Sequence, residues 1–271
     1  MNDPIHRQSN ITLGGRKTIP LSLGRFCVRI GLIQLFRSLP LLYLLIYQSD
    51  YKIQNFVTNL NLHLLPRIQE RLQQLSVHEP SHPESNFPES PSHIQQQALN
   101  SILIKDNKLF LHKVVRFYYT TYDIRRSEDI VNPLTSHCDI MLLATPENEG
   151  IGALPPSHPF TYARVLGIYH VNVIYTGPGM VDYEAMRFDF LFVRWFELRD
   201  DSQVKDEEAL DRLYFPPMSS KGSFGFVDPQ LVLRGCHLIP VFSQGRRHDD
   251  GIGLSRLSRD GFEWKSYFVN R

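Results

Sequence analysis

The chain has 271 residues, of which 42% are hydrophobic and 21% are charged, and its formal net charge is +1. This length and apolar content suffice for a substantial hydrophobic core and argue against wholesale disorder. The near-neutral charge excludes a uniformly basic coat for nucleic acid, and three cysteines are too few for a disulfide scaffold, which is typical of a reducing compartment.

The basic residues are concentrated near the N-terminus. Residues 1–75 hold nine lysines and arginines but only three acidic residues, a charge of +6, and the remainder of the chain carries −5. We therefore expect a basic, apolar N-terminal arm over residues 1–60, helical and partly disordered, in front of a mildly acidic body.

The arm contains an apolar run at residues 26–47 that is long enough to cross a bilayer. Arg29, Arg37 and Pro40 interrupt the run, and an arginine near its middle offsets the gain from the aliphatic residues. Membrane association through this run is therefore an alternative only. A second alternative is a mitochondrial transit peptide, because the arm is rich in arginine and serine and poor in acids.

An amphipathic helix is expected over residues 61–77. Leu65, Ile68, Leu72 and Leu75 recur at spacings of three, four and three, which places them on one helical face. Pro66 is expected in the first turn, where its missing N–H costs no hydrogen bond. We expect the apolar face to dock on the chain's own body.

A proline- and serine-rich linker is expected over residues 78–98, with Pro80, Pro83, Pro88 and Pro91 in its first part. Proline removes backbone donors and biases the preceding residue toward extended conformations, so no regular element is expected there. The β-rich domain would then occupy residues 99–271.

The pattern after residue 99 is dominated by short strands. A polar turn at residues 105–108 is expected to join two of them as a hairpin, Gly167 is expected to mark a bulge or bend, and one short helix is expected at 206–213. This pattern favours a mainly β fold of the α+β class, with a curved sheet or a β-barrel as the body. The expected strands are 102–104, 109–119, 138–144, 162–175, 188–196, 224–227, 231–234, 238–242 and 262–269.

No catalytic motif is found. The phosphate-binding loop, the dinucleotide fingerprint and the nucleophile elbow are all missing from the sequence. A metal-dependent nuclease would need Asp123, Asp139 or Asp189 to cluster with a histidine in one cleft, and nothing in their spacing requires this. We therefore predict no catalytic residue and no cofactor.

Two histidine–cysteine pairs, at 137–138 and 236–237, invite a zinc site. Neighbouring residues of a strand point to opposite faces, so neither pair can readily offer both of its side chains to one ion. We therefore predict no metal site and expect buried, free cysteines.

Six phrases, taken in order, resemble an uncharacterised region that is abundant in mushroom-forming fungi and associated with Plavaka-type transposon proteins. They lie at residues 114–126, 132–141, 162–170, 192–196, 224–229 and 232–242. The resemblance covers about residues 60–270. It implies a mobile-element or domesticated origin, with the DNA-cutting core outside this chain. The family pattern continues beyond the last residues of the chain, and the first sixty residues match no known pattern, so a truncated copy or an incorrect gene model is expected.

A second resemblance concerns layout. Phrases at residues 162–165, 193–196 and 234–241 resemble the strand order of bromo-adjacent homology domains, which are β-barrel chromatin-interaction modules. Some of these domains bind methylated histone lysines in aromatic cages. The resemblance implies a BAH-like body whose binding surface is built from aromatic residues, and the candidates are Tyr122, Tyr162, Trp195 and Phe196. Arg125 and Arg126 are further binding candidates, because they follow a tyrosine-rich strand end and arginine beside aromatic rings can stack on bases or enclose a methylated lysine.

These observations predict a non-enzymatic interaction module of transposon origin, located in the nucleus. The expected partner is a histone tail or another protein, and DNA could bind through local basic patches. Two alternatives stay open, which are a remnant of a metal-dependent transposase or nuclease and a transposon relic without a selected activity.

Overall fold

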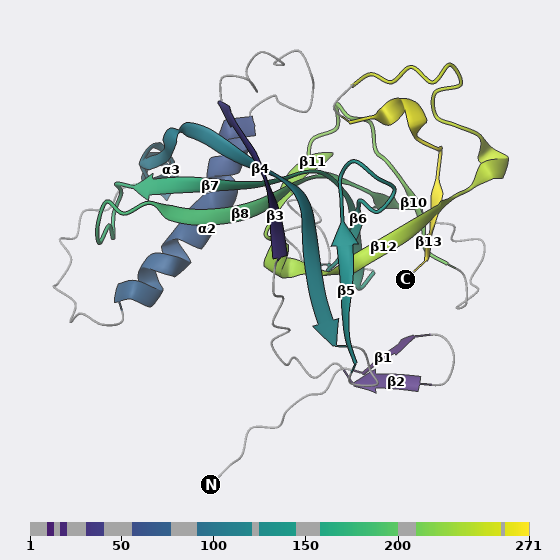
Figure 1. Ribbon diagram of the computed structural model, residues 1–271, viewed down its shortest axis with the longest axis horizontal. Coiled ribbons are helices and arrows are strands. Elements are labelled where there is room, and N and C mark those ends of the chain that lie inside the picture. The colour runs from purple at the N-terminus through teal and green to yellow at the C-terminus, as the bar shows by residue number, and fades with distance from the viewer. Residues whose placement is uncertain are drawn as a thin grey trace, which may run out of the picture.

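The computed structural model of the chain describes residues 10–13, 17–20, 31–40, 56–76, 91–120, 125–144, 158–199, 210–255 and 258–270. Its elements are arranged as Figure 1 shows. They are β1 (Asn10–Leu13), β2 (Lys17–Pro20), β3 (Gly31–Pro40), α2 (Phe56–Ser76), α3 (Pro91–Asn100), β4 (Ile102–Thr120), β5 (Arg126–Val131), β6 (Asp139–Leu143), β7 (Phe160–Tyr175), β8 (Met186–Trp195), β9 (Glu197–Leu198), β10 (Arg212–Tyr214), β11 (Phe224–Val227), β12 (Val232–Pro240) and β13 (Tyr267–Asn270), with short 3-10 helices at Pro229–Leu231, Phe242–Gln244 and Asp260–Phe262.

The prediction of a mainly β body is confirmed. Eleven strands, β3 to β13, form one sheet in which every pairing is antiparallel, while β1 and β2 form a separate pair. The main path runs β11-β8-β7-β6-β12-β13-β10-β9, and β4 branches from β7 and carries β3 and β5. Over the described strands the sheet does not close into a barrel. Of the two expected bodies, the β-barrel is therefore wrong and an open sheet is observed.

The sheet stays open because two strands share one edge of β7. β4 pairs with β7 along residues 102–112, and β6 pairs with the N-terminal part of the same β7 edge along residues 160–164. Beyond residue 112, β4 leaves β7 and pairs with β5 instead, and Figure 1 shows β4 bending away toward β5. The sheet therefore divides into a β4–β5 branch and a β6–β12 branch.

A helix does occupy the window predicted to be helical, but it is longer at its N-terminal end. α2 begins at Phe56, so Pro66 lies inside the helix and not in its first turn as expected. The buried side chains of Phe56, Leu60 and Leu64 extend the apolar face upstream. Their packing supports the additional helical turns in spite of the backbone hydrogen bond that a proline removes.

The apolar face of α2 docks on the sheet as expected. Leu65, Ile68 and Leu72 are buried, whereas Leu75 at the end of the predicted stripe is exposed. The helix residues form one core cluster with buried residues of β4, β7 and β8. Phe190 of β8 belongs to this cluster and Leu191 belongs to a second one, so the two clusters lie on opposite faces of the sheet.

The predicted linker is interrupted by a second helix. α3 begins at Pro91, inside the segment for which no regular element was expected. Proline is compatible with the first position of a helix, and the residues after it include good helix formers. Ala98 is buried in the α2 cluster, which shows that the end of the expected linker belongs to the packed body. Residues 77–90 lie outside the described residues.

The expected hairpin at residues 105–108 is instead an irregularity within one strand. β4 runs from Ile102 to Thr120, and its register with β7 shifts between Ile104 and Leu109. Asp106 and Asn107 adopt left-handed backbone angles, with φ of 57° and 50°. Asp and Asn tolerate this conformation in bulges as well as in turns, so the local sequence cannot distinguish the two.

Other strand predictions agree in place and differ in length. The register of β7 with β8 shifts between Val165 and Gly167, which confirms the bulge expected at Gly167. The expected strands 231–234 and 238–242 are one strand, β12, and the expected strand 262–269 contains a 3-10 turn before β13. In the described residues of the window 206–213, Arg212 and Leu213 belong to β10, so the helix expected there is not observed in them.

The described parts of the N-terminal arm are the strands β1, β2 and β3 and, at residues 56–60, the start of α2, so in the described residues the arm is helical only at its end. β3 pairs with β4 and lies in the middle of the apolar run considered as a membrane span. Among the described helices, none has the length and apolar character needed to cross a membrane. The rest of the expected arm, including the remainder of residues 26–47, lies outside the described residues.

Candidate functional site

The aromatic surface predicted from the strand layout is not assembled in the described residues. The side chains of Tyr162 and Phe196 are only 1% and 6% exposed and belong to the third core cluster. Tyr162 donates its hydroxyl hydrogen bond to Asp211 at 2.6 Å, and the ring of Phe196 stacks on Phe215 with centroids 3.9 Å apart. Both residues are therefore part of the core.

Trp195 is half-buried and packs against the second core cluster. Its neighbour Phe196, which follows the end of β8, packs in the third core cluster instead. Arg125 and Arg126 are exposed beside the start of β5, and Tyr122 lies outside the described residues. The five predicted residues that the structure describes do not converge on one surface.

Two further arginines, Arg194 and Arg247, are held by contacts within the fold. Arg194 is 1% exposed and forms an ion pair with the equally buried Glu263. Burial raises the pKa of Glu263 to about 7, although Arg194, Arg164 and Arg247 act in the opposite direction. Arg247 also donates a hydrogen bond to the backbone oxygen of Phe215 at 2.9 Å. These cations therefore stabilise the fold and are not free for nucleic acid.

A groove of about 680 Å³ lies where the two branches of the sheet approach each other. We call it the seam groove. One side of the seam groove is formed by β5, and the other side is formed by β6, β12 and the end of β13. Its lining residues are Glu128, Asp129, Ile130, Val131, Asn132, Thr135, His137, Asp139, Arg234, Gly235, Cys236, His237 and Asn270.

Asp129 connects the two sides of the seam groove. Its carboxylate accepts a hydrogen bond from the backbone N–H of Gly235 at 2.9 Å and one from the hydroxyl of Tyr119 at 3.2 Å. The guanidinium of Arg234 lies over the Tyr119 ring, 5.2 Å from its centroid, and 3.5 Å from the Asp129 carboxylate. A side chain thus spans a gap that no backbone ladder spans in the described strands.

The other charges of the groove are also paired. Glu128 accepts from Arg116 at 3.0 Å, and Asp139 accepts two hydrogen bonds from Arg164 at 2.7 and 3.1 Å. Asp139, one of the three aspartates considered for a nuclease site, is therefore held in an ion pair. Asp123 lies outside the described residues.

The two histidine–cysteine pairs both reach the groove region. The rings of His137 and His237 are tilted with centroids 6.5 Å apart, while Cys138 is buried and Cys236 is half-buried. Burial raises the pKa of Cys138 to about 12 and also raises the pKa of the Cys236 thiol. Protonated thiols are poor zinc ligands, and these four residues do not form a ligand cluster in the described part of the chain.

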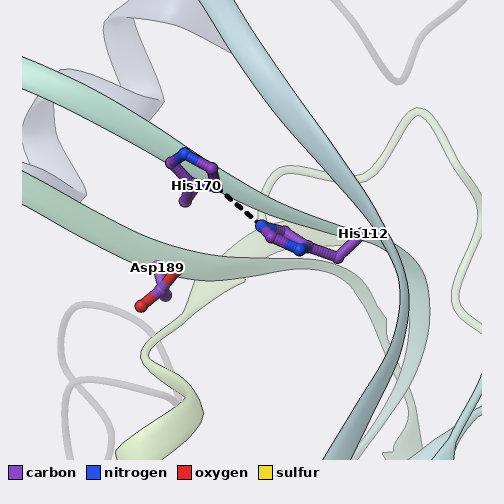
Figure 2. A group of neighbouring side chains, drawn as sticks. All are labelled: His112, His170 and Asp189. Atoms are coloured by element: carbon purple, nitrogen blue, oxygen red, sulfur yellow. Dashed lines mark hydrogen bonds between the residues drawn. The ribbon is translucent and has the colours of Figure 1, made fainter. Parts of the chain in front are cut away.

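A second site, unexpected from the sequence, lies on the sheet away from the groove. His112 of β4, His170 of β7 and Asp189 of β8 bring their ligand atoms within 4.8 Å of one another. His170 is the direct cross-strand partner of Asp189 and of Phe110, and His112 lies two residues beyond Phe110 on the same face. Figure 2 shows the two imidazole rings meeting between β4 and β7, with Asp189 on the neighbouring strand.

The geometry of this histidine–aspartate cluster is defined by close contacts. His112 Nε2 and His170 Nδ1 are 2.6 Å apart, and the His170 ring stacks on Phe110 with centroids separated by 4.4 Å. Arg187 holds one carboxylate oxygen of Asp189 through two hydrogen bonds of 3.1 and 2.8 Å. Arg67 of α2 donates to the backbone oxygen of Asp189 at 3.0 Å, which ties this strand to the helix.

Both histidines of the cluster are buried, with exposed fractions of 2% and 4%. Burial lowers the pKa of His170 to about 4, and the positive charges of Arg187 and His112 add to the effect. The pKa of His112 is also lowered, first by burial and then by Arg187. Both imidazoles are therefore neutral near pH 7. The buried Nδ1 of His112 finds no hydrogen-bond partner among the described residues.

Sequence patterns gave no direct signal for this cluster. Asp189 was among the aspartates for which a nearby histidine was considered, but neither His112 nor His170 was singled out. The usable signal was a histidine within each of two apolar, strand-like runs. Only the register of three strands shows that the side chains meet.

Comparisons of this chain with protein-family models, with curated proteins and with solved structures find no match.

Proposed function

We propose that this chain is a non-enzymatic interaction module that binds an extended, basic peptide segment of a protein partner in the seam groove. The observation that carries the proposal is the groove beside β5, where a strand that pairs only with β4 in the described sheet borders a hollow of about 680 Å³. Edge strands present unpaired backbone groups, and an extended peptide can add to them as a further strand.

Charge favours a peptide over DNA as the partner. Three carboxylates line the groove, those of Glu128, Asp129 and Asp139, against the single arginine Arg234. Each carboxylate is paired with an arginine, but of Arg116, Arg164 and Arg234 only the last lines the groove. The lining itself therefore offers more carboxylate acceptors than cations, which suits lysine and arginine better than phosphate. A histone tail is extended, basic and abundant in the nucleus, so it is the partner class we propose, together with nuclear localisation.

The binding mode we propose differs from an aromatic cage. Tyr162 and Phe196 are buried, and Tyr119 near the groove has its face covered by Arg234. Recognition would come from backbone pairing and carboxylates, so affinity should depend little on lysine methylation. The transposon origin and the BAH-like relationship belong to this proposal and are supported by the sequence phrases given above.

The test is binding of the full chain to an array of histone-tail peptides, methylated and unmodified, with duplex DNA as a competitor. Hits are titrated by fluorescence anisotropy against two matched variants. Ile130→Arg places a cation in the groove at a side chain that is 44% exposed, and Leu103→Arg places one at a 50% exposed side chain of β4 that does not line the groove.

The proposal predicts saturable peptide binding that Ile130→Arg weakens at least about tenfold, a cost near 1.4 kcal/mol, while Leu103→Arg leaves it unchanged. Equal loss in both variants, or binding of DNA alone, would contradict it. A folded chain that binds nothing would favour the relic.

A second candidate function is a remnant of a metal-dependent nuclease. One observation favours it, because Asp189 does lie beside two histidines. Phosphoryl-transfer nucleases commonly hold two metal ions between several carboxylates. Asp189 is the one carboxylate in the cluster and Asp139 is paired with Arg164, so the interaction module is favoured. Cleavage of duplex DNA with Mg²⁺ or Mn²⁺, lost in Asp189→Asn, would reverse this order.

A further inference from the structure

We propose that His112, His170 and Asp189 form a binding site for one divalent transition-metal ion, with Zn²⁺ as the reference ligand. Two imidazoles and one carboxylate are a recurrent ligand set for zinc and non-haem iron. The inference concerns a site outside the seam groove and does not depend on the proposed peptide binding.

The three ligand side chains converge from rigid elements of the fold. The three ligands come from three adjacent strands, β4, β7 and β8, and their ligand atoms lie within 4.8 Å of one another. Phe110 holds the His170 ring by a nearly parallel stack, with 3° between the planes. Side chains on paired strands are placed more precisely than side chains on loops, which is what coordination requires.

The two ligand nitrogens already face each other, with at most one hydrogen between them. Nε2 of His112 and Nδ1 of His170 face each other at 2.6 Å, so at most one of them carries a hydrogen in the neutral pair. Two nitrogens bound to a tetrahedral ion at ~2.0–2.1 Å lie roughly 3.3 Å apart. The two rings would therefore have to move apart by about 0.7 Å, roughly a third of one metal–nitrogen bond length, to admit an ion in place of the shared hydrogen.

The Asp189 carboxylate is oriented by Arg187 through only one of its two oxygens. Arg187 binds one oxygen of Asp189, Oδ1, so the other oxygen, Oδ2, stays available as a ligand in this arrangement. Outer contacts of this kind orient a ligating carboxylate. The Arg187 side chain is 47% exposed and can turn toward solvent when a cation enters. Asp189 itself is 29% exposed, which gives the ion a path from solvent.

The test uses the full chain freed of metal with a chelator. Zn²⁺ is titrated by calorimetry, and Co²⁺ is titrated while its visible absorption is recorded, because tetrahedral and octahedral Co²⁺ differ in intensity. The ligand variants are His112→Gln, His170→Gln and Asp189→Asn. The control is the double variant His137→Gln/His237→Gln, which removes a second histidine pair whose rings lie 6.5 Å apart.

We expect the wild-type chain to bind one equivalent of Zn²⁺. Each ligand variant should bind Zn²⁺ at least about tenfold more weakly, whereas the control variant should bind it with the wild-type affinity. Circular dichroism identifies any ligand variant that fails to fold, and Asp189→Asn, which keeps the shape of a partly exposed side chain, then decides the result. Zn²⁺ binding that the control abolishes, or no binding by the folded wild-type chain, would overturn the site. Both outcomes leave the peptide-binding experiment unaffected.

Discussion

The carboxylate of Asp129 on β5 accepts a hydrogen bond from the backbone N–H of Gly235 on β12, at 2.9 Å, across the gap between the two branches of the sheet. This contact keeps the seam together where strand pairing is missing. It also places a carboxylate and a strand edge on one side of the proposed peptide groove.

The first prediction concerns this bridge. Asp129→Ala removes the acceptor for Gly235 and for the Tyr119 hydroxyl, so we expect the free energy of unfolding to fall by about 1–2 kcal/mol. Urea denaturation of the full chain measures the change. Asp182→Ala is the matched control, because Asp182 accepts a local backbone hydrogen bond in an exposed loop. An equal effect of the two substitutions would contradict a bridging role for Asp129.

The buried ion pair of Arg194 and Glu263 gives the second prediction. Arg194→Met leaves a buried carboxyl group without its main partner, and we expect a loss of about 3–5 kcal/mol. The double variant Arg194→Met/Glu263→Gln should lose less than the sum of the single variants, because neither charge is then left alone. Additive losses in a double-mutant cycle would show that the two groups are not coupled.

Stability should depend on pH through the buried histidines. The pKa values of His170 and His63 are lowered from about 6.5 to about 4, mainly by burial. As pH falls from about 6.5 toward 4, the unfolded chain binds protons that the folded chain does not, so the free energy of unfolding decreases. We expect His170→Gln to remove about 1–3 kcal/mol of this pH dependence.

The measurement is urea denaturation of the wild-type chain and of His170→Gln across this pH range. The comparison of slopes separates the contribution of His170 from that of Glu263. The pKa of Glu263 is raised from 4.5 to about 7, so the contribution of Glu263 to the free energy of unfolding decreases as pH rises through this range. Identical slopes for wild type and His170→Gln would mean that His170 is not buried in its neutral form.

The bulge in β7 gives the fourth prediction. A Cβ atom at Gly167 would lie 2.4 Å from the Tyr169 ring, so Gly167→Ala should destabilise the fold by about 1–3 kcal/mol. Tyr169→Leu in the same chain removes the clash and should recover part of the loss. Thermal unfolding of the single and double variants tests this, and no recovery would place the strain in the backbone.

Much of the architecture could be predicted from local patterns. Apolar spacing predicts the helix that became α2, strand-like runs predict most strands, and the glycine inside one such run predicts the bulge at Gly167. The segment at Asp106 and Asn107 shows the limit, because its residues suit a hairpin turn and a bulge equally well. The partner strand decides between them, and the partner's register is not encoded locally.

The candidate sites depended still more on long-range pairing. His112 and His170 are 58 residues apart and meet only because β4 and β7 pair with one particular register. The seam groove exists because β4 leaves β7 at residue 112, which no local pattern indicates. Conversely, Trp195 and Phe196 are adjacent in the sequence but pack against different core clusters.

The central claim is that the seam groove binds a basic, extended peptide. Hydrogen exchange of the full chain, measured by mass spectrometry with and without an unmodified, lysine-rich histone-tail peptide, tests it most directly. The account predicts slower exchange in residues 126–132 and 232–237 and unchanged exchange in α2. Slower exchange confined to other segments, or no change at a saturating peptide concentration, would contradict it.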